Sequence, residues 1–325
     1  MAKRMDARRL RYFVTVAELG SFSAAARRLR IAQPALSRHV KSLETLLGVE
    51  LLIRDARGVH MTKHGVELFR HAREALEQLD MLPRLVGRGS ARISGRVVIG
   101  LPTSASAVLA KPVLQATLAR LPEVRIHLIE SLSGFLQEWI ESGRLDLCVL
   151  YDARPSPGIR LDPILTEDLW LVGAPSAFRK GQTEVRLQEL PRFPLIVPGA
   201  SHSHRRLVEG MALSHGVKLN VLAEVDSLPA LKTMTADGQV FTIVPFGAVH
   251  HEVAAGALQA LRIVEPVISR SVSLVTATSR SDSQACQAVA RLILEVAREL
   301  VVAQVWKGRA IGATDAPALP RKPRG

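Results

Sequence analysis

The sequence is poor in cysteine and has no long apolar run. Among its 325 residues the only two cysteines are Cys148 and Cys286. A disulfide framework is therefore not expected, and reduced thiols in a core are the simpler interpretation. No stretch approaches the ~18 consecutive apolar residues of a membrane helix, and the basic segment MAKRMDARRLRYF lacks the apolar core of a signal peptide. We therefore expect a cytoplasmic protein with no membrane partner.

The sequence also lacks the motifs of common enzymes and metal sites. It contains no G-x-S-x-G elbow, no G-x-G-x-x-G after a strand, no P-loop and no H-E-x-x-H. Its histidine pairs lack the cysteine or carboxylate spacing of a structural zinc site; they are His60/His64, His202/His204 and His250/His251. We therefore expect no enzymatic activity, no bound metal and no cofactor.

What the sequence does have is positive charge, and that charge is unevenly placed. The formal net charge is +13. Residues 1–65 carry 13 Lys and Arg against 5 Asp and Glu, and residues 307–325 carry 5 against 1. The region between them is close to neutral. This distribution favours a phosphate-binding head on a neutral body over general adhesion to anions.

The most informative stretch is 23–54, which predicts two short helices and a tight turn. Ser23 is expected to cap a helix over Ala24–Arg30, and Pro34 is tolerated in the first turn of the next helix. Gly48 is expected to end that second helix. At about 100° per residue, the apolar residues fall on one buried stripe: Leu36, Val40, Leu43 and Leu47. The opposite face carries Pro34, Ser37, Arg38 and Lys41, with Gln33 at the helix tip.

Two short apolar segments follow and resemble a wing. They are Glu50–Ile53 and Val59–Thr62, with Gly58 at the turn and Arg54 and Arg57 near the tip. An ordinary amphipathic helix with a solvated face would explain the second helix alone. Together, two crossing helices, a polar face and a basic wing predict a DNA-binding helix-turn-helix. Gln33 and Ser37 are then expected to reach base edges, and the wing arginines to reach phosphates or a narrow minor groove.

A long helix and an alternating body come next. Lys63–Gly87 has helical periodicity, and Pro83 is expected to stop or kink that helix. From Arg96 onward, strands and helices alternate, with an extended segment expected at Val124–Glu130. This alternation predicts a parallel sheet with covering helices. Polar residues follow several of the strands, where α/β folds bind ligands. These polar residues include Thr103, Ser104, Ser131, Ser133 and the run Ser201–His204, and Pro245–Phe246 follows a further strand. Each polar residue could equally be a helix cap instead of a ligand contact.

Residues 25–54 resemble the N-terminal signature of LysR-type transcriptional regulators. The residues that carry this resemblance are Ala25–Ala26, Leu29, Gln33–Pro34, Ser37, Leu43–Glu44, Leu47–Gly48 and Leu51–Arg54. The runs IAQPALS and LLIRDARGV are most similar to the nitrogen assimilation control branch. Leu52 departs from the phenylalanine of most members, a mild change because both side chains fill the same wing pocket.

The resemblance implies an α/β fold with an N-terminal winged helix-turn-helix, a linker helix and a two-lobed, periplasmic-binding-protein-like effector domain. It implies a bacterial regulator that binds a promoter inverted repeat of double-stranded DNA. The expected assembly is a homotetramer built from homodimers, with RNA polymerase as a candidate partner. An anionic small molecule would bind between the lobes. The residues matching effector positions are Thr103, Ser104, Ser131, His202, Ser203, His204, Pro245 and Phe246. The alternative is an effector-independent regulator of nitrogen assimilation genes, whose body serves only oligomerisation.

On this interpretation the chain divides into four parts. Residues 1–65 form the DNA-binding domain and 66–90 the linker and dimerisation helix. Residues 91–306 form the effector domain, with lobe 1 about 91–163 and 268–306 and lobe 2 about 164–267. The basic, Pro/Gly/Ala-rich residues 307–325 are expected to be a disordered tail.

Overall fold

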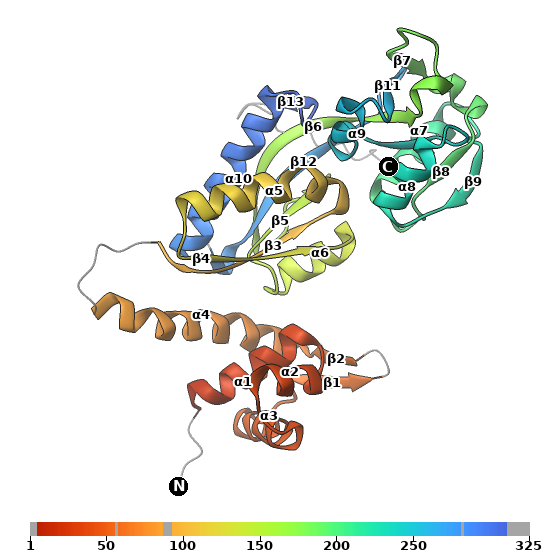
Figure 1. Cartoon of the computed structure of the whole chain (residues 1–325). Helices are drawn as coiled ribbons and strands as arrows, with labels where there is room; N and C mark the ends of the chain where they lie inside the picture. The colour runs from red at the N-terminus through yellow and green to blue at the C-terminus, as the bar shows by residue number, and fades with distance from the viewer. Residues whose placement is uncertain (1–4, 56–57, 87–92, 281–282, 311–325) are drawn as a thin grey trace, which may run out of the picture.

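The computed structural model describes residues 5–55, 58–86, 93–280 and 283–310. The N-terminal head consists of α1 (Ala7–Leu19), α2 (Phe22–Leu29), α3 (Gln33–Leu47) and the hairpin of β1 (Leu52–Asp55) with β2 (Gly58–Met61). In Figure 1 the head lies at one end of the molecule, separated from the body by α4 (Lys63–Val86). Apolar residues from all three head helices and from α4 form its core, including Phe13, Leu36 and Phe69.

The head differs from the sequence expectation at two helix positions. The cap of α2 is Ser21, whose hydroxyl accepts from the amide of Ala24 at 3.3 Å, so the expected Ser23 cap is wrong. The earlier start places Phe22 in the core, where it is 6% exposed. Leu47, expected to be buried, is 36% exposed. Glu44 faces inward instead, and its Oε1 accepts from the amides of Leu51 and Leu52 at 3.0 and 3.3 Å.

The long helix α4 begins at the expected residue but continues past the expected interruption. It starts at Lys63, where the hydroxyl of Thr62 accepts from the amide of Gly65 at 3.0 Å. It runs through Pro83 to Val86, so of the stop or kink expected at Pro83, the stop is wrong. A proline in a helix removes one backbone hydrogen bond. The backbone hydrogen bond that residue 83 would donate is therefore missing, and the helix continues for three residues beyond it.

The body is built on a curled mixed sheet whose strand order is β4-β3-β5-β12-β6-β11-β7, with β10 and β13 also paired to β6. Strands β3 (Gly95–Leu101), β4 (Val124–Glu130) and β5 (Leu147–Tyr151) run parallel. The expected parallel arrangement is confirmed for these three strands. The long strands β6 (Ile159–Gly173) and β12 (Ser269–Ala277) carry the chain out to lobe 2 and back, so they pair antiparallel.

Each lobe has its own apolar core. In lobe 1, α5 (Thr103–Arg120) and α10 (Gln284–Val302) cover one face of the sheet and α6 (Ser133–Glu141) covers the other. Neighbouring strand residues alternate between these cores, as in Val97 and Val98. Cys148 and Cys286 are both buried in lobe 1, and burial raises the pKa of the Cys148 thiol.

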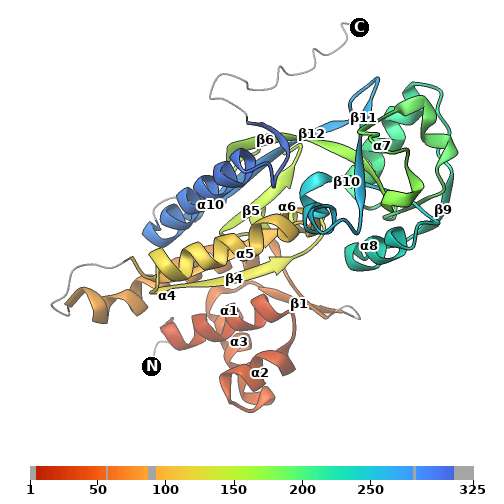
Figure 2. The same cartoon turned by 45° about the horizontal axis from the view of Figure 1, so that its top comes forward.

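Lobe 2 contains the shorter elements. They are β7 (Glu184–Arg186), β8 (Leu195–Val197), α7 (Ser203–Ser214), β9 (Val221–Glu224), α8 (Leu228–Ala236), β10 (Thr242–Pro245), α9 (His250–Ala254) and β11 (Gln259–Val264). Figure 2 shows β6 and β12 as the crossing between lobe 1 and lobe 2. Among the described residues, no helix combines the length and apolar content needed to cross a membrane.

The chain returns to the crossing strands at its C-terminal end. Gly308–Ala310 form β13, which pairs antiparallel with β6 opposite Leu165–Glu167. The buried indole of Trp306 donates to Oε2 of Glu167 at 2.7 Å. The expected disorder from residue 307 is therefore wrong for 307–310, and 311–325 lie outside the described residues.

Two sets of ion pairs join the head and α4 to lobe 1. The guanidinium of Arg73, on α4, donates to the carbonyl of Gly143 at 2.7 Å and lies 3.1 Å from Oδ1 of the fully buried Asp146. Asp146 also lies 2.9 Å from Nε of Arg280. On the head itself, Glu18 pairs with Arg96 of β3 at 2.9 Å. The head and lobe 1 therefore make specific polar contacts.

Candidate functional site

The first candidate site is the outward face of α3. The helix begins at Gln33, directly after Ala32, and no side chain caps it. The first backbone amides of α3 are therefore not occupied by a capping side chain. Pro34, Arg38 and Lys41 are exposed on this face, and Gln33 and Ser37 are half-buried. These are the five α3 residues that the sequence assigned to DNA, and the structure places them on one side of the head.

The wing arginine Arg54 is tied to α3. Its guanidinium donates to Oγ of Ser37 at 2.8 Å and stacks over the ring of Phe22 at 3.8 Å. The side chain remains exposed, and a guanidinium has five N–H donors, so others are left for a phosphate. Arg54 therefore links the wing to α3, a contact that the sequence did not reveal. Arg57 lies outside the described residues.

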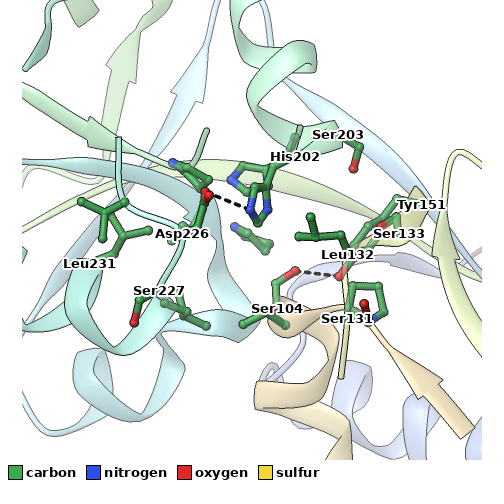
Figure 3. A pocket seen from close by; sticks show the side chains of 18 of the residues that line it. Ser104, Ser131, Leu132, Ser133, Tyr151, His202, Ser203, Asp226, Ser227 and Leu231 are labelled. Carbon is green, nitrogen blue, oxygen red and sulfur yellow. Dashed lines mark hydrogen bonds and ion pairs between the residues drawn. The ribbon is translucent and has the colours of Figure 1, made fainter. Parts of the chain in front are cut away.

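The second candidate site is a hollow between the two lobes (Figure 3). It encloses about 610 Å³ including its open mouth. The predicted residues that line it are Thr103, Ser104, Ser131, His202, Ser203, His204 and Pro245. The structure thus brings together residues up to 142 positions apart, from Thr103 to Pro245.

Phe246 does not line this cleft, and its assignment is wrong. It is 9% exposed in the short turn after β10, where its ring packs 5.4 Å from Trp170. The ammonium of Lys307 lies 3.8 Å from the centre of the Phe246 ring. Because β10 ends at Pro245, Phe246 already belongs to the following turn, where Trp170 and Lys307 cover its ring.

A buried charge network forms the floor of the cleft. Arg270, on β12, donates from Nε to Oε1 of Glu167 at 2.7 Å and from Nη2 to Oγ of Ser104 at 3.2 Å. Its guanidinium also stacks 3.4 Å over the ring of Tyr151, whose hydroxyl lies 2.7 Å from the same Ser104 Oγ. Burial raises the pKa of Tyr151 to about 12, so its phenol stays protonated. Since Glu167 neutralises Arg270, the floor offers hydroxyls rather than net charge.

Four helices begin at the wall of the cleft, and one of them, α8, is capped by the hydroxyl of Ser227. The other three lack a side-chain cap. They are α5 and α6 of lobe 1 and α7 of lobe 2, preceded by Pro102, Leu132 and His202. None of these three residues caps its helix with a side-chain hydrogen bond. Backbone amides of the first turns are therefore available to a ligand, and the helix dipoles favour negative charge there.

The two histidines differ in their surroundings. Burial, and then the nearby Arg270, lowers the pKa of His204 to about 3, so this ring is neutral at physiological pH. Its buried Nε2 has no hydrogen-bond partner among the described residues. His202 places Nε2 3.2 Å from Oδ1 of Asp226, close enough for an ion pair although the angle is not that of a hydrogen bond.

Sequence reasoning missed Tyr151, Asp226 and Arg270. Tyr151 is the last residue of β5, and Asp226 follows β9 by two positions, so the rule that selects polar residues after strands could have found both. Arg270 lies inside β12, and its pairing with Glu167 spans 103 residues. No local pattern marks it. In the part of the chain that the structure describes, no three His, Cys, Asp or Glu side chains are grouped to hold a metal.

Comparisons with known proteins agree with this architecture. Residues 7–66 match the family described as "Bacterial regulatory helix-turn-helix protein, lysR family", and residues 90–298 match "LysR substrate binding domain". The chain is 36% identical over 294 residues to the nitrogen assimilation regulatory protein nac of Klebsiella aerogenes, covering 90% of this chain and 95% of that protein. It is 34% identical over 293 residues to the protein of the same name from Escherichia coli, again covering 90% and 95%.

Solved structures share the fold over most of the chain. A full-length OxyR variant from Pseudomonas aeruginosa has a TM-score of 0.71 at 21% identity, covering 95% of this chain and 99% of that chain. Full-length CbnR complexed with its target DNA has a TM-score of 0.57 at 26% identity, covering 91% and 99%. The chain belongs to the LysR family of transcriptional regulators, with a DNA-binding helix-turn-helix head and an effector-binding body.

Proposed function

We propose that this regulator binds a promoter inverted repeat as a homotetramer and responds to a small molecule held between lobes 1 and 2. The observation that carries the proposal is the cleft itself, where three helices without side-chain caps and the unpartnered Nε2 of His204 meet. Buried polar groups without partners are costly, and a ligand that supplies the partners would recover that cost. We propose Thr103, Ser104, Ser131, His202, Ser203, His204 and Pro245 as its binding residues.

On DNA, α3 is the proposed major-groove element. Gln33 is suited to a bidentate contact with adenine, and Ser37 to a more tolerant one. Arg38 and Lys41 are exposed on the same face and would contact phosphates, with Pro34 packing at the helix tip. Arg54 would contact the backbone from the wing while holding Ser37 in place.

The ligand would act by favouring one arrangement of the lobes over another. A ligand shifts such an equilibrium only by its difference in affinity for the two states. Lobe 1 is joined to α4 through Arg73 and to the head through Arg96. A change in lobe arrangement could therefore alter how two heads are spaced in the assembly, and with it the contact with RNA polymerase. Acting on the bacterial chromosome, the protein would work in the cytoplasm.

Two measurements test this proposal. A thermal-shift screen of organic acids, aromatic acids and amino acids on the full-length protein should yield compounds that raise its melting temperature. Thr103→Val then removes a hydrogen-bonding group at nearly constant volume. We expect DNA affinity without ligand to change less than about threefold, under ~1 kcal/mol, and the ligand's effect on footprint length to be lost. The proposal would be refuted if no compound in the screen raised the melting temperature and the Thr103→Val variant still regulated a reporter gene like the parent.

The effector-independent alternative is favoured by one specific observation. The two curated relatives described above, at 36% and 34% identity, are both named nitrogen assimilation regulators. On this second proposal the chain would control nitrogen assimilation genes, and its body would serve oligomerisation alone. It predicts that no small molecule alters footprint length or DNA bending, while the pattern of bound promoters follows nitrogen supply.

A further inference from the structure

The cleft offers both signs of charge to a ligand. Its positive end comes from helix dipoles, since the starts of α5 and α6 face it from lobe 1. The hydroxyls of Ser104 and Ser131 lie on the same wall (Figure 3). The only guanidinium lining the cleft, that of Arg270, is already held by Glu167 at 2.6 Å. Helix α7 also begins at the cleft, from lobe 2, but the residue before it, His202, lies 3.2 Å from the carboxylate of Asp226. An anionic group of the ligand would therefore be bound by amides and hydroxyls of lobe 1.

The negative end is a carboxylate on lobe 2. Asp226 lines the cleft, and its side chain is 65% exposed. Its Oδ1 accepts from the amide of Gly199 at 2.8 Å and lies beside His202. Within the described part of the chain, Asp226 has no Lys or Arg partner, so its charge is open to a cationic ligand group.

The remaining lining limits what the rest of the ligand can be. Leu132, Val225, Leu231 and Val244 contribute apolar surface to the cleft. The neutral, buried His204 adds one hydrogen-bonding nitrogen whose partner is missing. These groups suit a small apolar or weakly polar side chain, and the space of about 610 Å³ with its mouth included is enough for one.

From this arrangement we infer that the cleft takes a zwitterionic α-amino acid, with its carboxylate at the starts of α5 and α6 and its ammonium at Asp226. The inference rests on the proposed function and narrows the anionic effector expected from the sequence. A simple carboxylate would bring a like charge close to Asp226, which disfavours binding. Because the two charged groups of the amino acid would contact different lobes, its binding would also draw lobe 1 and lobe 2 together.

The test compares three forms of one ligand on the full-length protein. The twenty amino acids are first screened by thermal shift, and the strongest binder is titrated by calorimetry beside its desamino acid and its decarboxylated amine. We expect each analogue to bind about tenfold or more weakly, because each leaves one end of the cleft unpaired.

A variant that removes the charge of Asp226 tests whether this carboxylate binds the ammonium of the ligand. Asp226→Asn keeps an oxygen to accept the Gly199 amide, so the loop is expected to fold unchanged. The variant should lose about tenfold in affinity for the amino acid and bind the desamino acid as well as or better than the parent. The matched control is Asp237→Asn, which changes an exposed carboxylate at the end of α8 outside the cleft and should leave all affinities unaltered.

Each outcome decides something different. If the desamino acid binds the parent as tightly as the amino acid, the zwitterion inference is overturned while the proposed effector cleft stands. If no amino acid, acid or amine binds although the protein still binds DNA, the zwitterion inference and the proposed effector cleft are both refuted. The comparison of analogues on the parent protein keeps the inference testable should Asp226→Asn not fold.

Discussion

Replacing Arg73 with methionine should loosen the attachment of α4 to lobe 1. The side chain is 5% exposed and donates to the carbonyl of Gly143 at 2.7 Å and to Oδ2 of Asp146 at 3.2 Å. Methionine retains much of the apolar stem and removes the charge, so packing against Phe69 and its neighbours is disturbed less than by alanine. The change therefore addresses the ion pair rather than the core.

The magnitude follows from what Arg73 leaves behind. Removing one partner of a buried ion pair costs about 3–5 kcal/mol when the other charge is stranded. Asp146 is not stranded, because Nε of Arg280 lies 2.9 Å from its Oδ1 and the amide of Val98 donates to its Oδ2 at 2.7 Å. We therefore expect a smaller loss of about 1–3 kcal/mol, set mainly by the unpaired carbonyl of Gly143.

The lost free energy should weaken the packing of α4 against lobe 1 more than it destabilises the fold of the body. In hydrogen exchange, amides of α4 should exchange faster in Arg73→Met than in the parent, while those of β3 and β5 keep their protection. The control is Arg70→Met, one turn earlier on the same helix and exposed. A double-mutant cycle with Asp146→Asn measures the coupling. Equal protection of α4 in parent and Arg73→Met, or a coupling energy near zero, would refute this reasoning.

Three other predictions concern the DNA-binding face and the cleft. Gln33→Ala should cost about 1–3 kcal/mol at the cognate operator and little on random DNA; equal weakening on both in a binding titration would show that Gln33 contacts only the backbone. Arg54→Ala should flatten the salt dependence of DNA affinity by about one unit of slope. It should also lower the melting temperature of the head, because the contacts with Ser37 and Phe22 are lost; a lower melting temperature with an unchanged slope would leave Arg54 a purely structural role. The pKa of His204 is lowered from 6.5 to about 3 in the folded protein, so the unfolded chain binds more protons in that interval and stability should fall as pH drops from 6.5 toward 3. His204→Phe should flatten that slope in denaturant titrations, and an unchanged slope would contradict the buried, neutral assignment.

The sequence predicted best those elements whose signals are local. The stripe of Leu36, Val40 and Leu43 is buried as expected, and Gly48 ends α3 in the left-handed conformation at φ 72°. Strand β4 has the predicted bounds, Val124–Glu130, because β-branched residues there are enclosed by clear turn signals. The cap of α2 was misplaced by two residues, since Ser21 and Ser23 are equally good acceptors and only the packing of Phe22 decides between them.

Long-range pairing accounts for most of what the sequence could not reveal. The cleft floor depends on Arg270 meeting Glu167, and the junction of α4 with lobe 1 depends on Arg73 meeting Asp146, 73 positions away. A charged residue inside a strand pattern gives no sign of which distant partner will neutralise it. For the same reason Asp226 could be predicted to lie at the cleft, but not that its charge would be left open.

The short strand β13 determines how the chain can be shortened. Its pairing covers the backbone of Leu165–Glu167, which would otherwise be an open sheet edge beside the crossing between the lobes. Open edges invite pairing with other chains and hence aggregation. A chain ending before Trp306 would also remove the indole that donates to Glu167, leaving a buried carboxylate oxygen without that donor. Residues 306–310 therefore belong to the folded body, and truncations or fusions at this terminus should be placed after Ala310.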